Sequence, residues 1–264
     1  MFFTHLFGDP EYTLQLYRAL HPEDTTSTEA DLEIVTLDNQ LLSQPYNDLG
    51  FTVGGKLLIL VEAQTTWTIN MVVRGLLYMA ETIHRHLVDT KQDLYGAEKV
   101  TFPEPEFYVI YTGNQQEKPE WLTLSGDFFG GRKTAIDVRV KMIYDGRQGD
   151  IIHQYITFCH VCDAQFRLYG RTREAVLEAI RICKNQDVLT RYLASRDKEV
   201  LSIMMTLFDH EEAFKAFLYQ KEKKARADAL LSLVKDGLLP ASEACKRLNM
   251  TESELKQKLS QDLP

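Results

Sequence analysis

Two apolar runs separated by a pair of glycines constrain the fold of this chain more than any other feature. The runs are Phe51-Thr52-Val53 and Leu57-Leu58-Ile59-Leu60-Val61, and Gly54-Gly55 stands between them. Glycine readily adopts the positive φ that a tight hairpin turn requires. The sequence therefore predicts two antiparallel strands joined by a turn at Gly54-Gly55.

Helices and strands are predicted on both sides of this hairpin. The expected elements are a helix over 9–20, a strand over 32–37, a long amphipathic helix over 68–88, strands over 107–111 and 136–144, and helices over 172–183, 187–194 and 198–235. Apolar residues recur at helical spacing in the helices and alternate with polar residues in the strand over 136–144. The order predicts an α/β fold with a helical C-terminal extension.

The last residues predict a helical hairpin. Gly237 is placed to end one helix, Pro240 to begin the next, and Thr251-Glu252-Ser253-Glu254 forms a capping box for a third. A helix-turn-helix reader of DNA has this shape, and so do many structural tails. Both interpretations stay open, because acids nearly balance bases in this segment.

The net charge of −8 is distributed unevenly. Residues 1–62 contain ten acidic and two basic side chains, whereas the remaining 202 residues contain 28 of each sign. Affinity for phosphate depends on clustered Lys and Arg, which the chain has locally over 132–147 and 167–198. An acidic first part that could collect metal ions thus precedes a longer part with local basic surfaces.

Two carboxylates flank the predicted hairpin at equal distances from its turn. Asp48 lies seven residues before Gly55 and Glu62 seven residues after it, so closing the turn brings both to the same end. Such a pair suits a hard divalent cation such as Mg²⁺, which takes oxygen ligands. Gln64 follows Glu62 by two residues and therefore belongs to the same face of the strand.

Glu62 ends an apolar run that reads as an interior strand, where an uncompensated carboxylate is costly. A metal ion would compensate the charge, and so would a salt bridge to Arg74 or Lys56. The spacing of these residues does not distinguish the two.

The segment from Leu32 to about Leu87 resembles the recombination-promoting nuclease / putative transposase family, a branch of the PD-(D/E)XK nuclease superfamily. The resemblance rests on Asp48, Glu62-Ala63-Gln64, Thr65, Asn70, Arg74 and Tyr78. It implies a restriction-endonuclease-like core, with a central mixed sheet flanked by helices. We expect this domain over residues 1–197 and a helical C-terminal region over 198–264.

The resemblance also implies Mg²⁺- or Mn²⁺-dependent hydrolysis of DNA phosphodiester bonds with low sequence specificity, in recombination or in mobile elements. Asp48, Glu62 and the carbonyl of Ala63 would hold the metal ion, which acidifies a bound water and neutralises charge on the phosphate. Gln64 stands where the superfamily usually has Lys, and an amide can orient a reactant but cannot pass a proton. The alternative is a catalytically weak or inactive DNA-binding or regulatory protein that retains the fold.

Asn70, Arg74 and Tyr78 are the candidate substrate-binding residues. Asn70 and Arg74 lie one helical turn apart and could contact a phosphate, or could instead hydrogen-bond Glu62 or a strand end. Glu11 and Glu33 lie in regions where relatives contribute an additional acid, and neither is matched.

The remaining motifs predict no further site. Cys159-His160-Val161-Cys162 supplies at most three zinc ligands with no second pair, so a buried, half-polar strand is expected there. The chain has four cysteines, no run of about 18 apolar residues and no basic and apolar leader. We therefore expect a soluble cytoplasmic protein with no membrane association. The resemblance implies DNA as partner, and a homodimer stays open.

Overall fold

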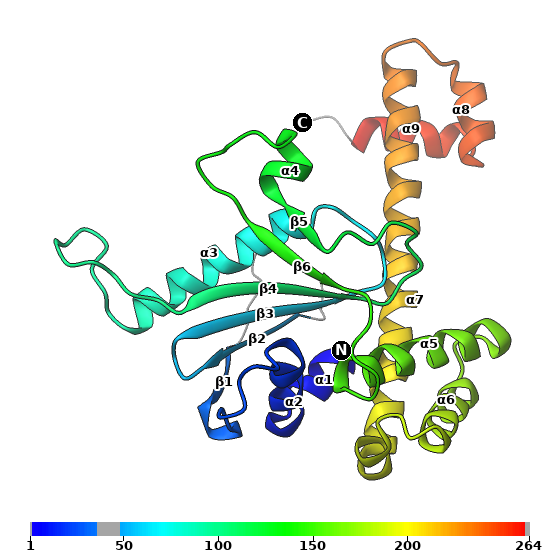
Figure 1. Ribbon diagram of the computed structural model, residues 1–264. Helices are drawn as coiled ribbons and strands as arrows, with labels where there is room; N and C mark the ends of the chain where they lie inside the picture. The colour runs from blue at the N-terminus through cyan, green and yellow to red at the C-terminus, as the bar shows by residue number, and fades with distance from the viewer. Residues whose placement is uncertain (1, 36–47, 262–264) are drawn as a thin grey trace. The chain divides into compact units, whose positions relative to one another are not determined.

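The computed structural model describes residues 2–35 and 48–261 (Figure 1). Within these ranges the strands form one six-stranded mixed sheet in the order β1-β2-β3-β4-β6-β5. The strands are β1 (Leu32–Val35), β2 (Asp48–Val53), β3 (Leu57–Gln64), β4 (Glu104–Tyr111), β5 (Trp121–Thr123) and β6 (Arg139–Ile143). Helices flank this sheet, so the predicted α/β class with a mixed sheet is confirmed.

The hairpin predicted from the glycine pair is present. β2 and β3 are antiparallel, and the pair nearest the turn is Val53 with Leu57. In the turn, φ is 57° at Gly54 and 65° at Gly55. Both values lie in the left-handed region that glycine adopts without a steric penalty. The strand predicted over 32–37 is β1 as far as Val35, and its last two positions lie outside the described residues.

Helix α3 (Met71–Asp89) connects β3 to β4, which pair in parallel. β4 also pairs in parallel with β6, while β5 and α4 (Leu124–Phe129) lie between β4 and β6 in the chain. β5 adds an antiparallel strand at the outer side of β6. The strands predicted over 107–111 and 136–144 and the helix over 68–88 therefore exist with somewhat different ends, whereas α4 and β5 were not predicted.

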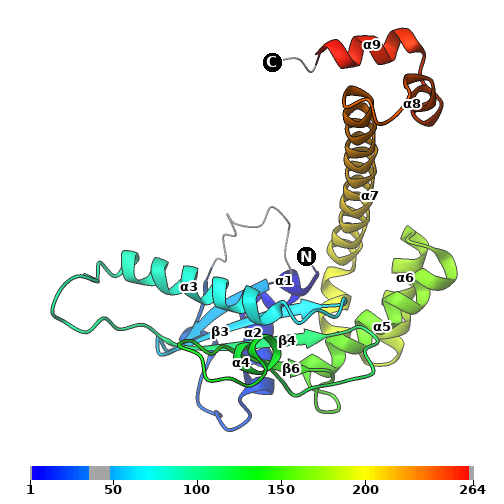
Figure 2. The same ribbon diagram turned by 90° about the horizontal axis from the view of Figure 1, so that it is seen from above.

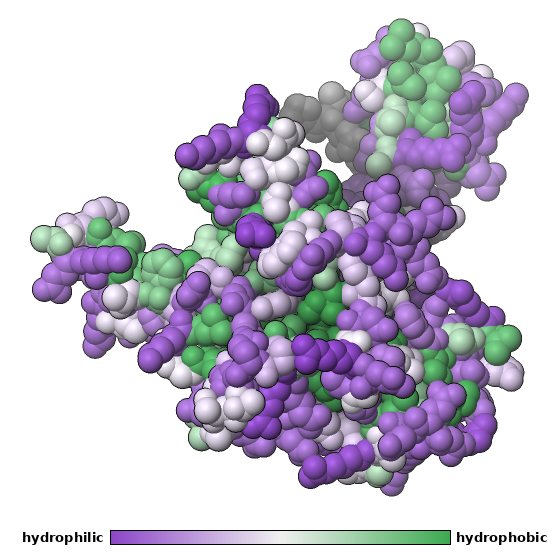
Figure 3. Space-filling view, viewed as in Figure 1, coloured by the Kyte–Doolittle hydropathy of each residue, from purple (hydrophilic) through white to green (hydrophobic). Residues whose placement is uncertain are grey.

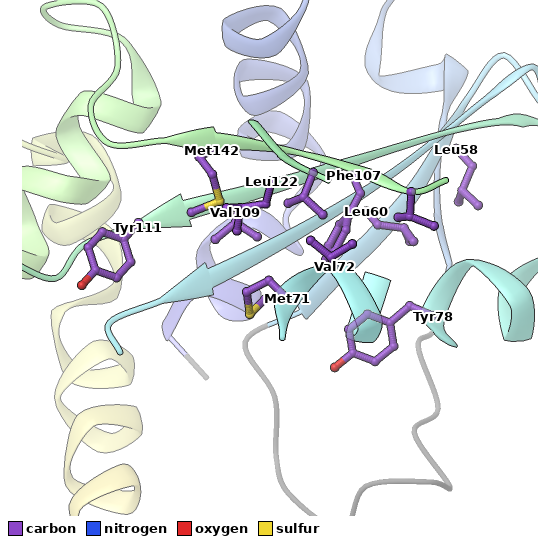
Figure 4. Packing of buried hydrophobic residues seen from close by; sticks show 12 residues of the cluster. Leu58, Leu60, Met71, Val72, Tyr78, Phe107, Val109, Tyr111, Leu122 and Met142 are labelled. Atoms are coloured by element: carbon purple, nitrogen blue, oxygen red, sulfur yellow. The ribbon is translucent and has the colours of Figure 1, made fainter. Parts of the chain in front are cut away.

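One face of the sheet packs against α3 (Figure 4). Met71, Val72 and Tyr78 of the helix join a buried cluster with Leu60 and Phe107 of the strands. The packing is closest at Gly75, where a Cβ atom would lie 2.2 Å from Cδ1 of Phe107. A residue without a side chain is therefore needed for the helix to approach β4 this closely.

Two short helices, α1 (Phe2–Phe7) and α2 (Pro10–Leu20), lie on the other side of the sheet from α3 (Figure 2). Asp9 caps α2 by accepting a hydrogen bond from the backbone N–H of Glu11. The ring of Phe2 packs in a tilted arrangement against that of Phe158 in the helix α5 (Ile151–Tyr169), with 4.4 Å between ring centroids. The helix predicted over 9–20 is confirmed, and α1 was not predicted.

The segment around Cys159 and Cys162 corrects one prediction. It lies within the helix α5 (Ile151–Tyr169) and is not a buried strand. The buried residues of this helix recur at helical spacing: Ile151, Ile152, Tyr155, Ile156, Phe158, Cys162 and Gln165. Burial raises the pKa of Cys162 well above its usual value and that of Cys183 to about 11, so these thiols stay protonated at neutral pH.

The remaining helices are α6 (Arg173–Asn185), α7 (Thr190–Lys235), α8 (Ala241–Leu248) and α9 (Glu252–Gln261). A three-residue 3₁₀ turn over Glu29–Asp31 precedes β1. α7 has non-helical backbone at Arg196, between the two helices predicted over 187–194 and 198–235. Thr251 and Glu254 exchange the hydrogen bonds of a capping box at the start of α9. The predicted C-terminal helical hairpin is therefore confirmed.

The chain divides into two compact units, Met1–Met205 and Thr206–Pro264. The first contains the sheet, and the second has a small apolar core of its own around Leu231, Ala244, Cys245 and Leu255. In the face shown in Figure 3 hydrophilic residues predominate. Among the described residues, no helix has both the length and the apolar character needed to cross a membrane.

Candidate metal and phosphate site

The open end of the β2–β3 hairpin brings two acidic residues into register. Asp48 and Glu62 are direct Cα partners in the antiparallel ladder. Direct partners in such a ladder belong to the same face of the sheet and have Cβ atoms about 5 Å apart. This is the face that packs against α3, because Leu58 and Leu60 precede Glu62 on alternate positions and contact that helix.

Glu62 is buried, with 2% of its surface exposed, and forms an ion pair with the helix above it. Nη2 of Arg74 lies 2.7 Å from Oε1 of Glu62. A buried charge needs a partner of opposite charge or a metal ion. Of the two salt-bridge partners predicted for Glu62, Arg74 is the one in contact, whereas Lys56 is exposed at the turn.

Arg74 is itself held in place by other side chains of α3. Its Nε and Nη2 atoms donate to Oη of Tyr78 at 3.3 and 3.0 Å, and its Nη1 lies 3.6 Å from Sδ of Met71. Tyr78 is buried with 5% of its surface exposed. Tyr78 therefore positions the guanidinium of Arg74, and its own side chain is too buried to contact a substrate.

The other two predicted site residues lie nearer the solvent. Gln64 is partly exposed, and its Nε2 donates to the backbone carbonyl of Thr66 at 2.9 Å. Asn70 precedes the first turn of α3, is exposed, and makes no side-chain cap bond. Asn70 and Arg74 are also joined by the first helical bond, from the Arg74 N–H to the Asn70 carbonyl. Gln64 thus lies two residues after Glu62 on β3, and Asn70 lies one helical turn before Arg74.

The structure brings neither of the two further acids to Glu62. Glu11 forms an ion pair with Arg191 at 2.7 Å. Glu33 is the β1 partner of Thr52, which pairs with Leu58, so Glu33 lies level with a position four residues before Glu62 on β3. At the rise of a strand, this level is about 13 Å from Glu62 along β3, and Glu33 itself lies two strands to the side.

Metal-binding clusters are absent from the part of the chain that the structure describes, if a cluster requires three or more His, Cys, Asp or Glu side chains. The predicted site has two carboxylates and one backbone carbonyl, so it has fewer than the three side-chain ligands that define such a cluster. The register places Asp48 opposite Glu62 at adjacent ends of β2 and β3, and Ala63 follows Glu62 on β3.

Gly75 is the residue of this region that the sequence analysis missed. It lies one position after Arg74, and its missing side chain lets α3 approach Phe107. Its signal was a glycine inside an otherwise helical pattern, which usually has a packing reason.

Comparison with known proteins identifies no matching family model, no similar curated protein and no similar solved structure. Function must therefore be argued from the geometry of this site.

Proposed function

We propose that this chain is a Mg²⁺- or Mn²⁺-dependent DNA endonuclease with a restriction-endonuclease-like core. The observation that carries the proposal is the register of the β2–β3 hairpin, in which Asp48 is the Cα partner of Glu62 at the strand ends. A mixed sheet with a parallel crossover through α3 supports the proposed core. With this function we also propose a role in recombination or mobile elements, a cytoplasmic location and a homodimer.

The donor set fits a hard divalent cation. Carboxylate and carbonyl oxygens are the ligands that Mg²⁺ takes, and Asp48, Glu62 and the backbone of Ala63 would supply them. A carboxylate has two oxygens and about four lone-pair directions, so it can accept more than one partner at a time. When bound, the ion would supply an acidified water and neutralise phosphate charge.

The neighbouring residues would prepare the site for this chemistry. Arg74 holds Glu62 in one orientation through the ion pair between its Nη2 and Oε1 of Glu62, at 2.7 Å. Gln64 would orient the attacking water or the phosphate through its amide, which carries no charge. Asn70, exposed beside α3, would contact the phosphate.

The second candidate is a DNA-binding or regulatory protein without catalysis. Two observations favour it: Arg74 binds Glu62, and the amide of Gln64 already donates to Thr66. These bonds would stabilise the same strand ends in a protein that no longer cleaves DNA.

Cleavage of supercoiled plasmid by the purified full chain in Mg²⁺ or Mn²⁺ separates the two candidates. We expect nicked and linear products from the wild type, and a loss of at least a hundredfold in rate for Glu62→Gln and Asp48→Asn, since each removes a ligand charge. Glu104→Gln is the matched control, because this acid is exposed at the opposite end of the same sheet, beside Leu57.

Equal cleavage by the wild type and both site variants would exclude the proposed site. Binding of DNA without cleavage in any divalent metal would favour the second candidate over the nuclease.

A further inference from the structure

A groove in the second unit is lined by one helix face and by parts of the two following helices. It encloses a cavity of about 590 Å³. Its lining residues come from α7, α8, the connection after α8, and α9: Tyr219, Gln220, Lys223, Lys224, Arg226, Ala227, Asp228, Leu231, Arg247, Leu248, Met250 and Lys258. All of them belong to the unit Thr206–Pro264.

The charges of this unit are concentrated in the groove. Residues 206–264 contain ten basic and ten acidic side chains, so the unit is neutral as a whole. Five of the basic side chains but only one acid, Asp228, line the groove. The groove is therefore strongly cationic, and the surplus of acids lies elsewhere on the unit.

Most of the cationic groups in the groove are available to a ligand. Lys223, Lys224, Arg226 and Lys258 are exposed, and none of them forms an ion pair with a residue that the structure describes. Arg247 pairs with Glu243 at 2.8 Å and is still 55% exposed. An anionic ligand would thus gain several cationic contacts without breaking internal ones.

The apolar side chains that line the groove also pack in the core of the second unit. Leu231, Leu248 and Met250 belong to the small core of the unit and are buried or partly buried. The lining also contains five cationic side chains, and the ring of Tyr219 is 64% exposed. Phosphates need cations and a nucleobase needs an aromatic face.

We propose that this groove binds single-stranded nucleic acid. The phosphates would contact the lysines and arginines, and a base would stack on Tyr219, as in other binders of single strands. A groove between packed helices admits a flexible single strand more readily than a stiff duplex. This binding is independent of the metal site proposed above and requires no divalent ion.

Fluorescence anisotropy of the full chain in EDTA tests the groove without any cleavage. The probe is a fluorescein-labelled oligothymidylate of about 16 nucleotides, within the site sizes of single-strand binders. We expect Lys223→Glu combined with Lys224→Glu to lower affinity at least tenfold. We also expect it to reduce the slope of log affinity against log salt by about 1.4, since each phosphate contact contributes about 0.7.

Two further variants separate the groove from general charge. Lys246→Glu combined with Lys256→Glu makes the same change in charge on the same unit, outside the lining residues, and should alter affinity less than threefold. Tyr219→Leu should lower affinity about five- to a hundredfold, because it removes a stacking surface. Because binding is measured in EDTA, without the divalent ion that the nuclease site requires, the groove and the nuclease site can fail separately.

Three results would overturn the proposal. The first is an equal loss of affinity in the Lys223/Lys224 and Lys246/Lys256 variants. The second is a loss of duplex affinity in the Lys223/Lys224 variant as large as its loss of single-strand affinity. The third is displacement of the oligonucleotide by polyglutamate at equal charge concentration, which would indicate an acidic protein partner instead.

Discussion

At the scale of single residues, the ion pair between Glu62 and Arg74 determines the energetics of the site. Counting outward from Gly55 predicts that Asp48 and Glu62 share the end of the hairpin, because an antiparallel register follows from the turn. The partner of Glu62 could not be chosen from the sequence. Whether Arg74 reaches Glu62 depends on how closely α3 packs on β3, which spacing in the chain does not fix.

Removing Arg74 should destabilise the protein strongly. Arg74→Met leaves the carboxylate of Glu62, 2% exposed, without its guanidinium, and breaking a buried pair in this way costs about 3–5 kcal/mol. We expect urea unfolding to show a free energy of unfolding lower by that amount and, as a result, a lower urea midpoint. The double variant Arg74→Met with Glu62→Gln should recover most of the loss, because no uncompensated charge remains.

The control for this prediction is an exposed ion pair in the same unit. Arg181 and Glu178 form one on α6, and Arg181→Met should leave the urea midpoint nearly unchanged because water replaces the lost partner. A loss in Arg181→Met as large as in Arg74→Met would show that burial is not the cause.

At the scale of elements, the sequence predicts those whose pattern is local and misses those that depend on tertiary contacts. The hairpin, α2, α3 and the C-terminal helices follow from glycines, caps and periodicity. β5 has three residues and exists only through its pairing with β6. α5 was expected to be a strand around Cys159, because a mixture of Cys, His and Val masked a helical stripe that is buried against α1 and α6.

The contact between α3 and β4 depends on Gly75. Glycine to alanine inside a helix normally stabilises it by about 1 kcal/mol. At Gly75 the added Cβ would lie 2.2 Å from the buried ring of Phe107, so we expect Gly75→Ala to destabilise the protein by about 1–3 kcal/mol in thermal or urea unfolding. Combining it with Phe107→Leu should cost less than the sum of the two single changes. A stabilising Gly75→Ala would contradict this packing.

At the scale of the whole molecule, the chain consists of two units with separate apolar cores. The first buries its residues between the sheet and α3, α1 and α2, and the second around Leu231 and Leu255. The sequence separated the C-terminal helical region from the domain that contains the sheet, with the division placed at residue 197. Contacts divide the chain after Met205, inside α7, where a continuous helix gives the sequence no break to detect.

Separate cores imply that the second unit can be weakened alone. Thr251→Ala removes the side-chain oxygen that caps α9 and should cost this unit about 1 kcal/mol. Hydrogen–deuterium exchange should then accelerate within residues 241–261 and stay unchanged in β2, β3 and β4. Acceleration throughout the sheet would show that the two units unfold together.

We propose that Asp48 and Glu62 bind one divalent cation between adjacent strand ends. Titration of the full chain with Mn²⁺, followed by electron paramagnetic resonance of the free ion, counts the bound ions directly. We predict one site in the wild type and in Glu104→Gln, and its loss in both Glu62→Gln and Asp48→Asn. Equal Mn²⁺ binding by the wild type and the two site variants, or no binding by the wild type, would contradict the claim.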